Sequence, residues 1–228
     1  TRHSALQGVP AIFPKEFLGP YTEQAIMQTK TYSDLYNLVT ALSGVGSFTT
    51  EEKLNILQFV NRRAFEAYRT SPSWPRYAVI GEERTIGDSG LVPYTQTSLA
   101  NISDFQRIYR TQPFLRNSAM EYEFYVDGNG ANVLNVVANT ASSVFVNYQK
   151  ELPTFTEEST DIPYEFFFFL AHSVYADFLR MDGQHDKALT EEQVAGTYLA
   201  LELEKIDMRS NNNTINKRFS TYVSRQAR

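Results

Sequence analysis

The histidines are the first residues to weigh for catalytic chemistry, and the sequence has three of them. His3 lies near the start, His172 lies inside an aromatic segment, and His185 lies where a turn between two helices is expected. None is paired with a second histidine at the spacing of metal ligands, and the only nucleophile beside His172 is Ser173. We therefore expect His172 to be a neutral, hydrogen-bonded histidine of a core or an interface rather than a general base.

Two pairs of adjacent carboxylates, Glu82-Glu83 and Glu157-Glu158, are the other candidates. Either pair could hold a divalent cation or act as acid and base. Adjacent carboxylates in loops are usually solvated, and neighbours on a strand point to opposite faces, so the solvated interpretation is favoured. The run Asp127-Gly128-Asn129-Gly130 lacks the later bidentate acid of a calcium loop and is better read as a turn. Without a nucleophile elbow, a phosphate-binding loop or a dinucleotide fingerprint, the sequence predicts no catalytic residue, no metal and no cofactor.

Composition narrows the class of protein. The 228 residues make one large domain or two small ones, and a hydrophobic share of 42% is enough to build a core. The absence of cysteine excludes disulfides, thiol nucleophiles and cysteine-based zinc sites. The net charge of −5 argues against general DNA binding, because phosphate neutralisation needs clustered Lys and Arg. An aromatic share of 14% suggests rings that face partner chains as well as the core.

The pattern along the chain predicts an α+β fold: mainly an α-helical bundle of about four helices, with an inserted antiparallel β module. We divide it into an N-terminal arm (1–30), the bundle (31–73 and 161–209), the β module (74–160) and a C-terminal docking tail (210–228). No secretory signal is visible at the start and no apolar run is long enough to cross a membrane, so a soluble protein is expected.

The first two helices have clear boundary signals. Ser33 is expected to cap the first, which ends at Gly44. Thr49 and Glu52 form a capping box for the second, and Pro72 ends it. Because the connection between them is short, the two helices should pack as an antiparallel pair.

Strand signals follow. Residues 104–110 alternate, with Phe105 and Tyr109 on one side and Ile108 on the other. Segments 121–126 and 133–137 flank the turn at 127–130 and should form a hairpin. A strand over 144–148 completes a small antiparallel sheet or barrel.

The third helix is expected to start at Asp161, as N-cap, with Pro163 in its first turn. It is apolar on nearly all sides, so it should be central in a core or shared between a core and a subunit interface. Asp182-Gly183 ends it, and a fourth helix should run from about Asp186 to Arg209. The aromatic residues assigned to this core or inter-subunit role are Phe166, Phe167, Phe168, Phe169, Tyr175 and Phe178.

The C-terminal tail is basic and partly apolar. The polar run 210–214 is expected to end the fourth helix as a linker. The tail beyond it has no acidic residue, and such a segment usually becomes ordered on a partner, although a solvated terminus is the alternative. Together with Arg209 the tail carries +5, which leaves about −10 on residues 1–208. The residues expected to dock, by charge complementarity and aromatic anchoring, are Arg209, Ile215, Lys217, Arg218, Phe219, Tyr222, Arg225 and Arg228.

Two segments carry a resemblance to a known family. The run 161–184, from Asp-Ile-Pro-Tyr-Glu-Phe-Phe to Arg-Met-Asp-Gly-Gln, and its sequel 187–203 resemble the C-terminal helical hairpin of head-to-tail adaptor proteins of tailed bacteriophages. The run 48–64, with Ser73-Trp74-Pro75-Arg76, is also similar to these proteins. The resemblance covers roughly two thirds of the chain and consists of helix-packing patterns, not chemical signatures.

The resemblance implies a structural, non-catalytic virion protein that assembles in the host cytoplasm. Its copies would form a homo-oligomeric ring, commonly a dodecamer, beneath the portal protein of the filled head. The C-terminal segment would reach the portal, and the other face would accept a tail or nozzle protein. Such a ring helps to retain packaged DNA, and an acidic wall would let DNA pass without sequence-specific binding.

Three other functions stay open at this point. One is another virion ring, a head decoration protein or a tail-completion protein. A second is a virion-associated hydrolase that uses Glu82 or Glu157. A third is a carbohydrate-binding module in which Tyr94, Tyr109 and Tyr122 stack on sugars, although a core or an interface explains these rings as well.

Overall fold

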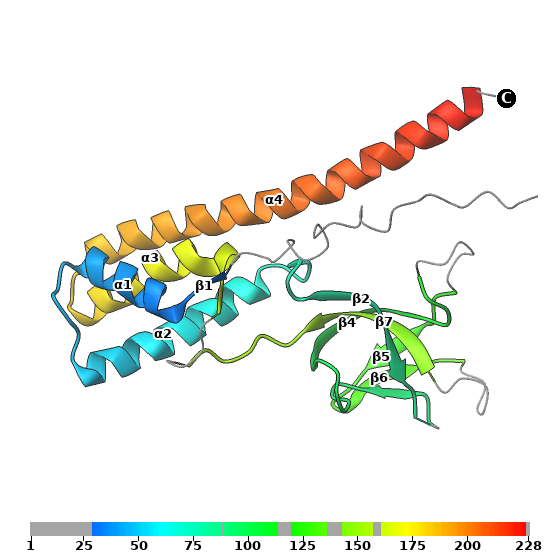
Figure 1. Cartoon of the computed structure of the whole chain (residues 1–228), viewed down its shortest axis with the longest axis horizontal. Helices are drawn as coiled ribbons and strands as arrows, with labels where there is room; N and C mark the ends of the chain where they lie inside the picture. Colours follow the sequence, from blue (N-terminus) through cyan, green and yellow to red (C-terminus); the bar gives the residue numbers. More distant parts are fainter. Residues whose placement is uncertain (1–28, 88, 114–119, 136–142, 157–160, 227–228) are drawn as a thin grey trace, which may run out of the picture.

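The computed structural model describes residues 29–87, 89–113, 120–135, 143–156 and 161–226, with the backbone alone beyond Met208. The described part contains four helices and three small antiparallel sheets, so the predicted α+β class is confirmed. Figure 1 shows the helices gathered at one end of the molecule and the strands of the β module at the other.

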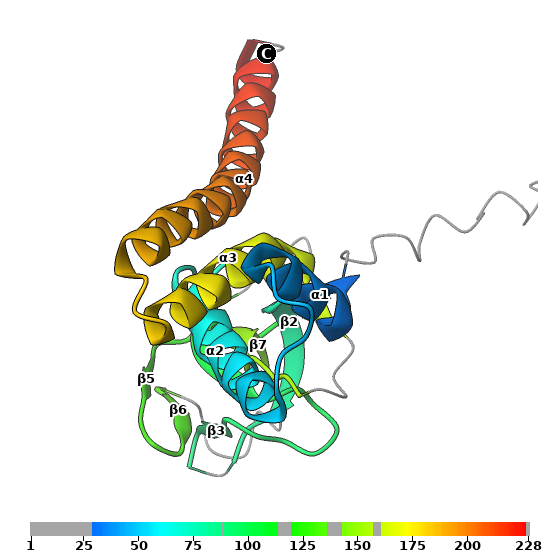
Figure 2. The ribbon, with the colours of Figure 1, turned by 90° about the vertical axis from the view of Figure 1, so that its left-hand side faces the viewer.

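The bundle is built around its third helix. It consists of α1 (Tyr32–Ser43), α2 (Thr50–Arg69), α3 (Tyr164–Met181) and α4 (His185–Gln226). α1, α2 and α4 each pack on α3, whereas α1 and α2 approach each other at few points (Figures 1 and 2). α1 and α2 do contact each other, with Lys53 of α2 5.7 Å from the ring centroid of Tyr36 of α1, but each packs mainly on α3, whose apolar surface is broad enough to bury both helices. The shared core includes Leu35, Val39, Ile56, Val60, Phe166, Leu170, Val174, Ala195 and Leu199.

The helix boundaries mostly follow the predicted signals. Thr49 and Glu52 form the capping box of α2, with the Thr49 amide donating to the Glu52 carboxylate at 2.7 Å. Gly44 ends α1 in the left-handed conformation, at φ +69°. The cap of α1 is Thr31, not Ser33, because Thr31 and Asp34 make a second capping box two residues earlier than expected.

The start of α3 also differs from the prediction. Asp161 is not its cap, since Ile162 and Pro163 form the short strand β8 and α3 begins only at Tyr164. β8 pairs antiparallel with β1 (Thr29–Lys30), the last two residues of the predicted N-terminal arm. Residues 1–28 of that arm lie outside the described residues.

The β module consists of two three-stranded antiparallel sheets rather than a closed barrel. One has the order β2-β7-β4, from β2 (Ala78–Thr85), β4 (Ile102–Tyr109) and β7 (Ser143–Lys150). The other has the order β3-β6-β5, from β3 (Leu91–Pro93), β5 (Phe124–Val126) and β6 (Gly130–Val133). A single apolar core holds both sheets and includes Val92, Ile102, Phe105, Ile108, Ala131, Val144 and Val146.

The β5–β6 hairpin confirms the predicted turn, but its first strand is shorter than predicted and its second, at Gly130–Val133, lies earlier than the predicted 133–137. The Asp127 carboxylate accepts hydrogen bonds from the backbone amides of Asn129, at 2.7 Å, and Gly130. Gly130 is required at φ +151°, because a Cβ there would lie 2.1 Å from the carbonyl oxygen of Val92. Glu121 forms only an isolated bridge, with Tyr109, and residues 136–137 lie outside the described part.

β4 does not keep the simple alternation that its sequence suggests. Its register against β7 shifts between Phe105 and Arg107, so the strand contains a bulge. As a result Phe105 and Ile108 are both buried in the core of the module, while Gln106 and Arg107 are exposed. The prediction that Phe105 and Ile108 point to opposite sides is wrong.

The chain enters the β module through aromatic residues that belong to the bundle. Trp74 is only 1% exposed, and its ring meets Phe166 edge-on at 4.9 Å. Tyr77 packs beside them in the bundle core, and the first strand of the module begins at the next residue. The bundle core thus anchors the base of the module.

α4 is much longer than predicted. It continues through the polar run 210–214 to Gln226, so the expected linker and helix end near Arg209 are wrong. Asparagine and serine disfavour a helix by less than about 0.7 kcal/mol each, and no Gly or Pro follows Met208 within α4. Figures 1 and 2 show that the C-terminal part of α4 extends beyond the bundle.

Candidate functional site

The aromatic residues of α3 serve mainly the core of the chain itself. Phe166, Phe167 and Phe169 are buried, and Phe178 is partly buried against the same core. Tyr175 packs beside a small cluster formed by the ends of α3 and α4 that face each other. Among the six residues assigned to a core or inter-subunit role, only Phe168 is an exposed side chain, at 36%.

Phe168 belongs to a ladder of rings on the outer side of α3 and α4. It stacks on Tyr198 at 5.2 Å between ring centroids and meets Tyr164 edge-on at 5.9 Å. Tyr198 also stacks on His172 at 5.3 Å. The His172 ring is 16% exposed and its Nδ1 lies 2.7 Å from the Glu191 carboxylate, so this histidine holds α3 and α4 together.

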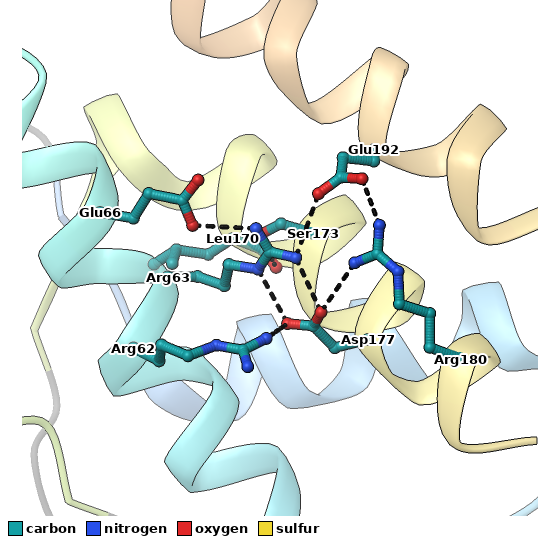
Figure 3. A network of polar contacts seen from close by, with 8 residues as sticks. All are labelled: Arg62, Arg63, Glu66, Leu170, Ser173, Asp177, Arg180 and Glu192. Atoms are coloured by element: carbon teal, nitrogen blue, oxygen red, sulfur yellow. Dashed lines mark hydrogen bonds and ion pairs between the residues drawn. The ribbon is translucent and has the colours of Figure 1, made fainter. Parts of the chain in front are cut away.

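A network of charged side chains ties α2, α3 and α4 together (Figure 3). Asp177 of α3, only 4% exposed, accepts hydrogen bonds from both Nε and Nη2 of Arg63, at 2.8 and 2.7 Å. Arg62 donates to the same carboxylate at 2.5 Å. Arg180 bridges Asp177 to Glu192 of α4, which also lies 3.3 Å from Arg63. The arrangement is a structural clamp rather than a reactive centre, because every carboxylate in it is paired with an arginine.

The electrostatics of the clamp follow from burial and pairing. Burial by itself raises the pKa of Asp177, but the hydrogen bonds from Arg63 and Arg62 outweigh it and hold that pKa below its usual value. The hydrogen bond from Arg180 likewise lowers the pKa of Glu192. Sequence reasoning missed this network. The available signal was Asp177 and Arg180, three residues apart in an otherwise apolar helix, where buried charges require partners.

The carboxylate proposed for a hydrolase is also engaged structurally. Glu82 accepts hydrogen bonds from Nε of Arg84, at 2.9 Å, and from the Tyr148 hydroxyl, at 2.7 Å. Arg84 is fully buried and lies over the ring of Tyr148, with 4.6 Å between the guanidinium carbon and the ring centroid. Burial raises the pKa of Tyr148 to about 12, which keeps its hydroxyl protonated as a donor. The pair Glu157-Glu158 lies outside the described residues.

Of the three tyrosines proposed to stack on sugars, Tyr94 and Tyr122 pack against the core of the module and Tyr109 is buried. Tyr109 is 9% exposed. Tyr94 packs against Phe105 at 5.4 Å and donates its hydroxyl proton to the carbonyl of Asp127. Tyr122 is partly buried against the same core. The three rings therefore do not form an exposed sugar-stacking surface.

The predicted docking residues lie almost entirely on α4. Positions 209–226 are helical, so the basic and aromatic residues of the tail occupy one continuous rod instead of a separate segment behind a linker. Arg228 lies outside the described residues. The residues placed on α4 are Arg209, Ile215, Lys217, Arg218, Phe219, Tyr222 and Arg225.

The described residues contain no group of three or more His, Cys, Asp or Glu residues arranged to hold a metal ion. Among their helices, none is both long and apolar enough to cross a membrane.

Comparison with known proteins adds no assignment. No protein-family model and no curated protein matches the chain, so the resemblance to phage adaptor proteins stays a prediction.

Proposed function

We propose that the chain is a non-catalytic structural subunit of a tailed bacteriophage, one copy of the adaptor ring between the portal protein and the tail. The observation that carries the proposal is the length of α4 and the basic charge of its second half. α4 is a helix of 42 residues whose first half belongs to the bundle and whose second half extends beyond it. From residue 209 onward its sequence is basic and contains no acidic residue, which suits a segment that docks on another protein.

The body of the chain fits a ring wall. α3 is covered by three other helices, and the charged clamp fixes α2, α3 and α4 relative to one another. The β module stands on the side of the bundle toward which α4 extends, and a tail or nozzle protein would attach to it in this proposal. Because residues 1–208 carry about −10, a channel lined by these subunits would gain little from binding DNA phosphates.

The test is assembly with the portal protein encoded by the same genome. Mixtures of the two purified proteins are imaged by electron microscopy, and the expected result is a ring of this chain under the portal. A chain that never associates with portal contradicts the proposal. A chain that instead stays with empty heads is a decoration protein, the other structural function left open by the sequence.

To test the role of the tail, the variant must leave the bundle intact. Deletion of residues 211–228 removes only α4 positions beyond Ile206, the last residue of α4 packed against the core. We expect this variant to unfold like the full chain and to lose portal binding. The charge-reversed pair Lys217→Glu and Arg218→Glu, on the full-length helix, should weaken binding and reduce its salt dependence. Unchanged co-purification of the truncated chain with portal would contradict the docking role.

A further inference from the structure

α4 has a second apolar row that its own bundle does not cover. The row that faces the bundle contains Ala188, Ala195 and Leu199, which are buried, and Ile206, which packs against the core. Roughly 80° to 160° away around the same helix, Tyr198, Leu201 and Met208 are exposed at 37%, 49% and 55%. Large apolar side chains on the outer side of a bundle helix indicate a surface that another chain covers.

This outer row has the spacing of a coiled coil. Its positions alternate by four and three residues without interruption, and we call the row the α4 stripe. It spans nearly five heptads, about 50 Å of helix, which is longer than the three to four heptads that mark a coiled coil. Its members are Val194, Tyr198, Leu201, Lys205, Met208, Asn212, Ile215, Phe219, Tyr222 and Gln226.

The bundle-facing row does not continue in the same way. After Ile206 its next positions are Arg209, Asn213, Asn216 and Ser220, all polar, before a single apolar residue at Val223. The stripe, in contrast, stays apolar at Ile215, Phe219 and Tyr222. The second half of α4 therefore lacks a continuous apolar row on the side that faces its own bundle. Its apolar row is the α4 stripe, which another helix could cover.

The distribution of charge along α4 favours a second α4 helix as the partner, in antiparallel orientation. Residues 185–208 of α4 contain six acidic and two basic residues, whereas residues 209–226 contain four basic and no acidic ones. Two α4 helices in parallel register would place the basic halves side by side. In antiparallel register each basic half lies along an acidic half, which is favourable over the whole length.

We propose that the α4 stripe is covered by the α4 helix of a second copy of the chain, in antiparallel orientation. Antiparallel heptad packing about the centre of the stripe, near position 210, places Leu201 opposite Phe219 of the second copy and Met208 opposite Asn212. The ring of Phe168, stacked on Tyr198, widens the surface on which the incoming helix lies.

The inference goes beyond the adaptor proposal and does not depend on it. An antiparallel pair points its two tails in opposite directions, so it cannot exist inside a ring whose tails all reach one portal. The pair is instead a form of the free chain, in which the basic tail is covered until the two copies separate.

Directed cross-linking tests the pairing and its orientation, and the absence of native cysteine means that every disulfide reports an introduced one. Full-length Leu201→Cys with an affinity tag is mixed with untagged Phe219→Cys and oxidised. We expect the tagged–untagged disulfide to be the main product, and each variant alone to stay largely uncross-linked. Disulfides between two copies of Leu201→Cys would indicate parallel pairing, and no disulfide in any mixture would indicate no α4 pairing. Either result overturns the proposal.

Light scattering gives an independent measurement of the same pair. Leu201→Glu should raise the dimer dissociation constant at least about tenfold. The matched control is Leu189→Glu, on the same helix and 55% exposed but off the stripe, and its dissociation constant should stay within about twofold of the wild-type value. Circular dichroism verifies that both variants are folded. A wild-type chain that is monomeric at the highest soluble concentration, or a Leu201→Glu variant as dimeric as the control, contradicts the inference.

Discussion

The two halves of α4 are continuous in backbone but differ in what holds them. In the first half, Leu199 and Ala195 pack into the bundle core, and Glu192 joins the charged clamp through Arg180. In the second half the positions that would face the bundle are polar from Arg209 to Ser220, and the helix extends past α3 (Figure 2). The comparison shows that helix formation and helix anchoring are separate properties. The first needs only residues that tolerate helical geometry, whereas the second needs an apolar row at the correct angle.

The largest effect should come from breaking the clamp that anchors the first half. Asp177→Ala leaves Arg63, only 7% exposed, without its main partner, and removing one side of a buried pair costs about 3–5 kcal/mol. Urea unfolding followed by the fluorescence of Trp74, the sole tryptophan and part of the bundle core, measures this loss. As a control, Arg62→Ala removes the 59% exposed partner of the same carboxylate and should cost less than about 1 kcal/mol.

A matched pair of truncations compares the two halves directly. Leu199→Ala removes a side chain that is 8% exposed from the bundle core and should lower the free energy of unfolding by about 2–3 kcal/mol. Phe219→Ala, in the second half, should change it by less than about 0.5 kcal/mol when the chain is monomeric. The free energy of unfolding of each variant is measured by urea titration under the same conditions. If Phe219→Ala destabilises the monomer as much as Leu199→Ala does, the second half is anchored to the body and the comparison fails.

The sequence indicated the fold class, the capping box of α2 and the central place of α3, because these depend on local spacing and on one helix being apolar on almost every side. It did not indicate the bulge that puts Phe105 and Ile108 on one face, since register is set by pairing with β7. The early start of α1 and the late start of α3 depend on Thr31 with Asp34 and on the pairing of β8 with β1.

The misplaced end of α4 has a different cause. A run of asparagines is a weak signal for the end of a helix, because each asparagine disfavours the helix less than a Gly or a Pro would. The charged clamp was missed because its members, on α2, α3 and α4, are far apart in the sequence and meet only after the bundle has formed.

The clamp should also make the stability of the bundle depend on pH. The pKa of Asp177 is lowered in the folded state, so its contribution is fully present above its unfolded pKa of about 4 and is lost as the pH falls through the folded value. We therefore expect the urea midpoint to fall as the pH is lowered from about 6 to about 3. The effect is smaller than that of Asp177→Ala, because protonation leaves the side chain in place. Asp177→Asn should be less stable at pH 6 and should show a flatter profile, and an equally steep profile would assign the pH dependence to other carboxylates.

The smallest effect on global stability should come from breaking the helix itself in the second half. Asn212→Pro removes a backbone hydrogen bond and costs a helix interior about 3 kcal/mol locally, so the helical signal in circular dichroism should fall. The free energy of unfolding measured by Trp74 fluorescence should stay within about 0.5 kcal/mol, because the bundle-facing row is polar from Arg209 to Ser220.

That measurement is made in a Leu201→Glu background, where self-association through the stripe is removed and only contacts within one chain remain. A drop of about 3 kcal/mol in that background would mean that the helical rod beyond residue 209 is thermodynamically coupled to the bundle. An unchanged value together with reduced helicity would mean that the first half folds without it. The second half is then available to whichever helix or protein covers its apolar row.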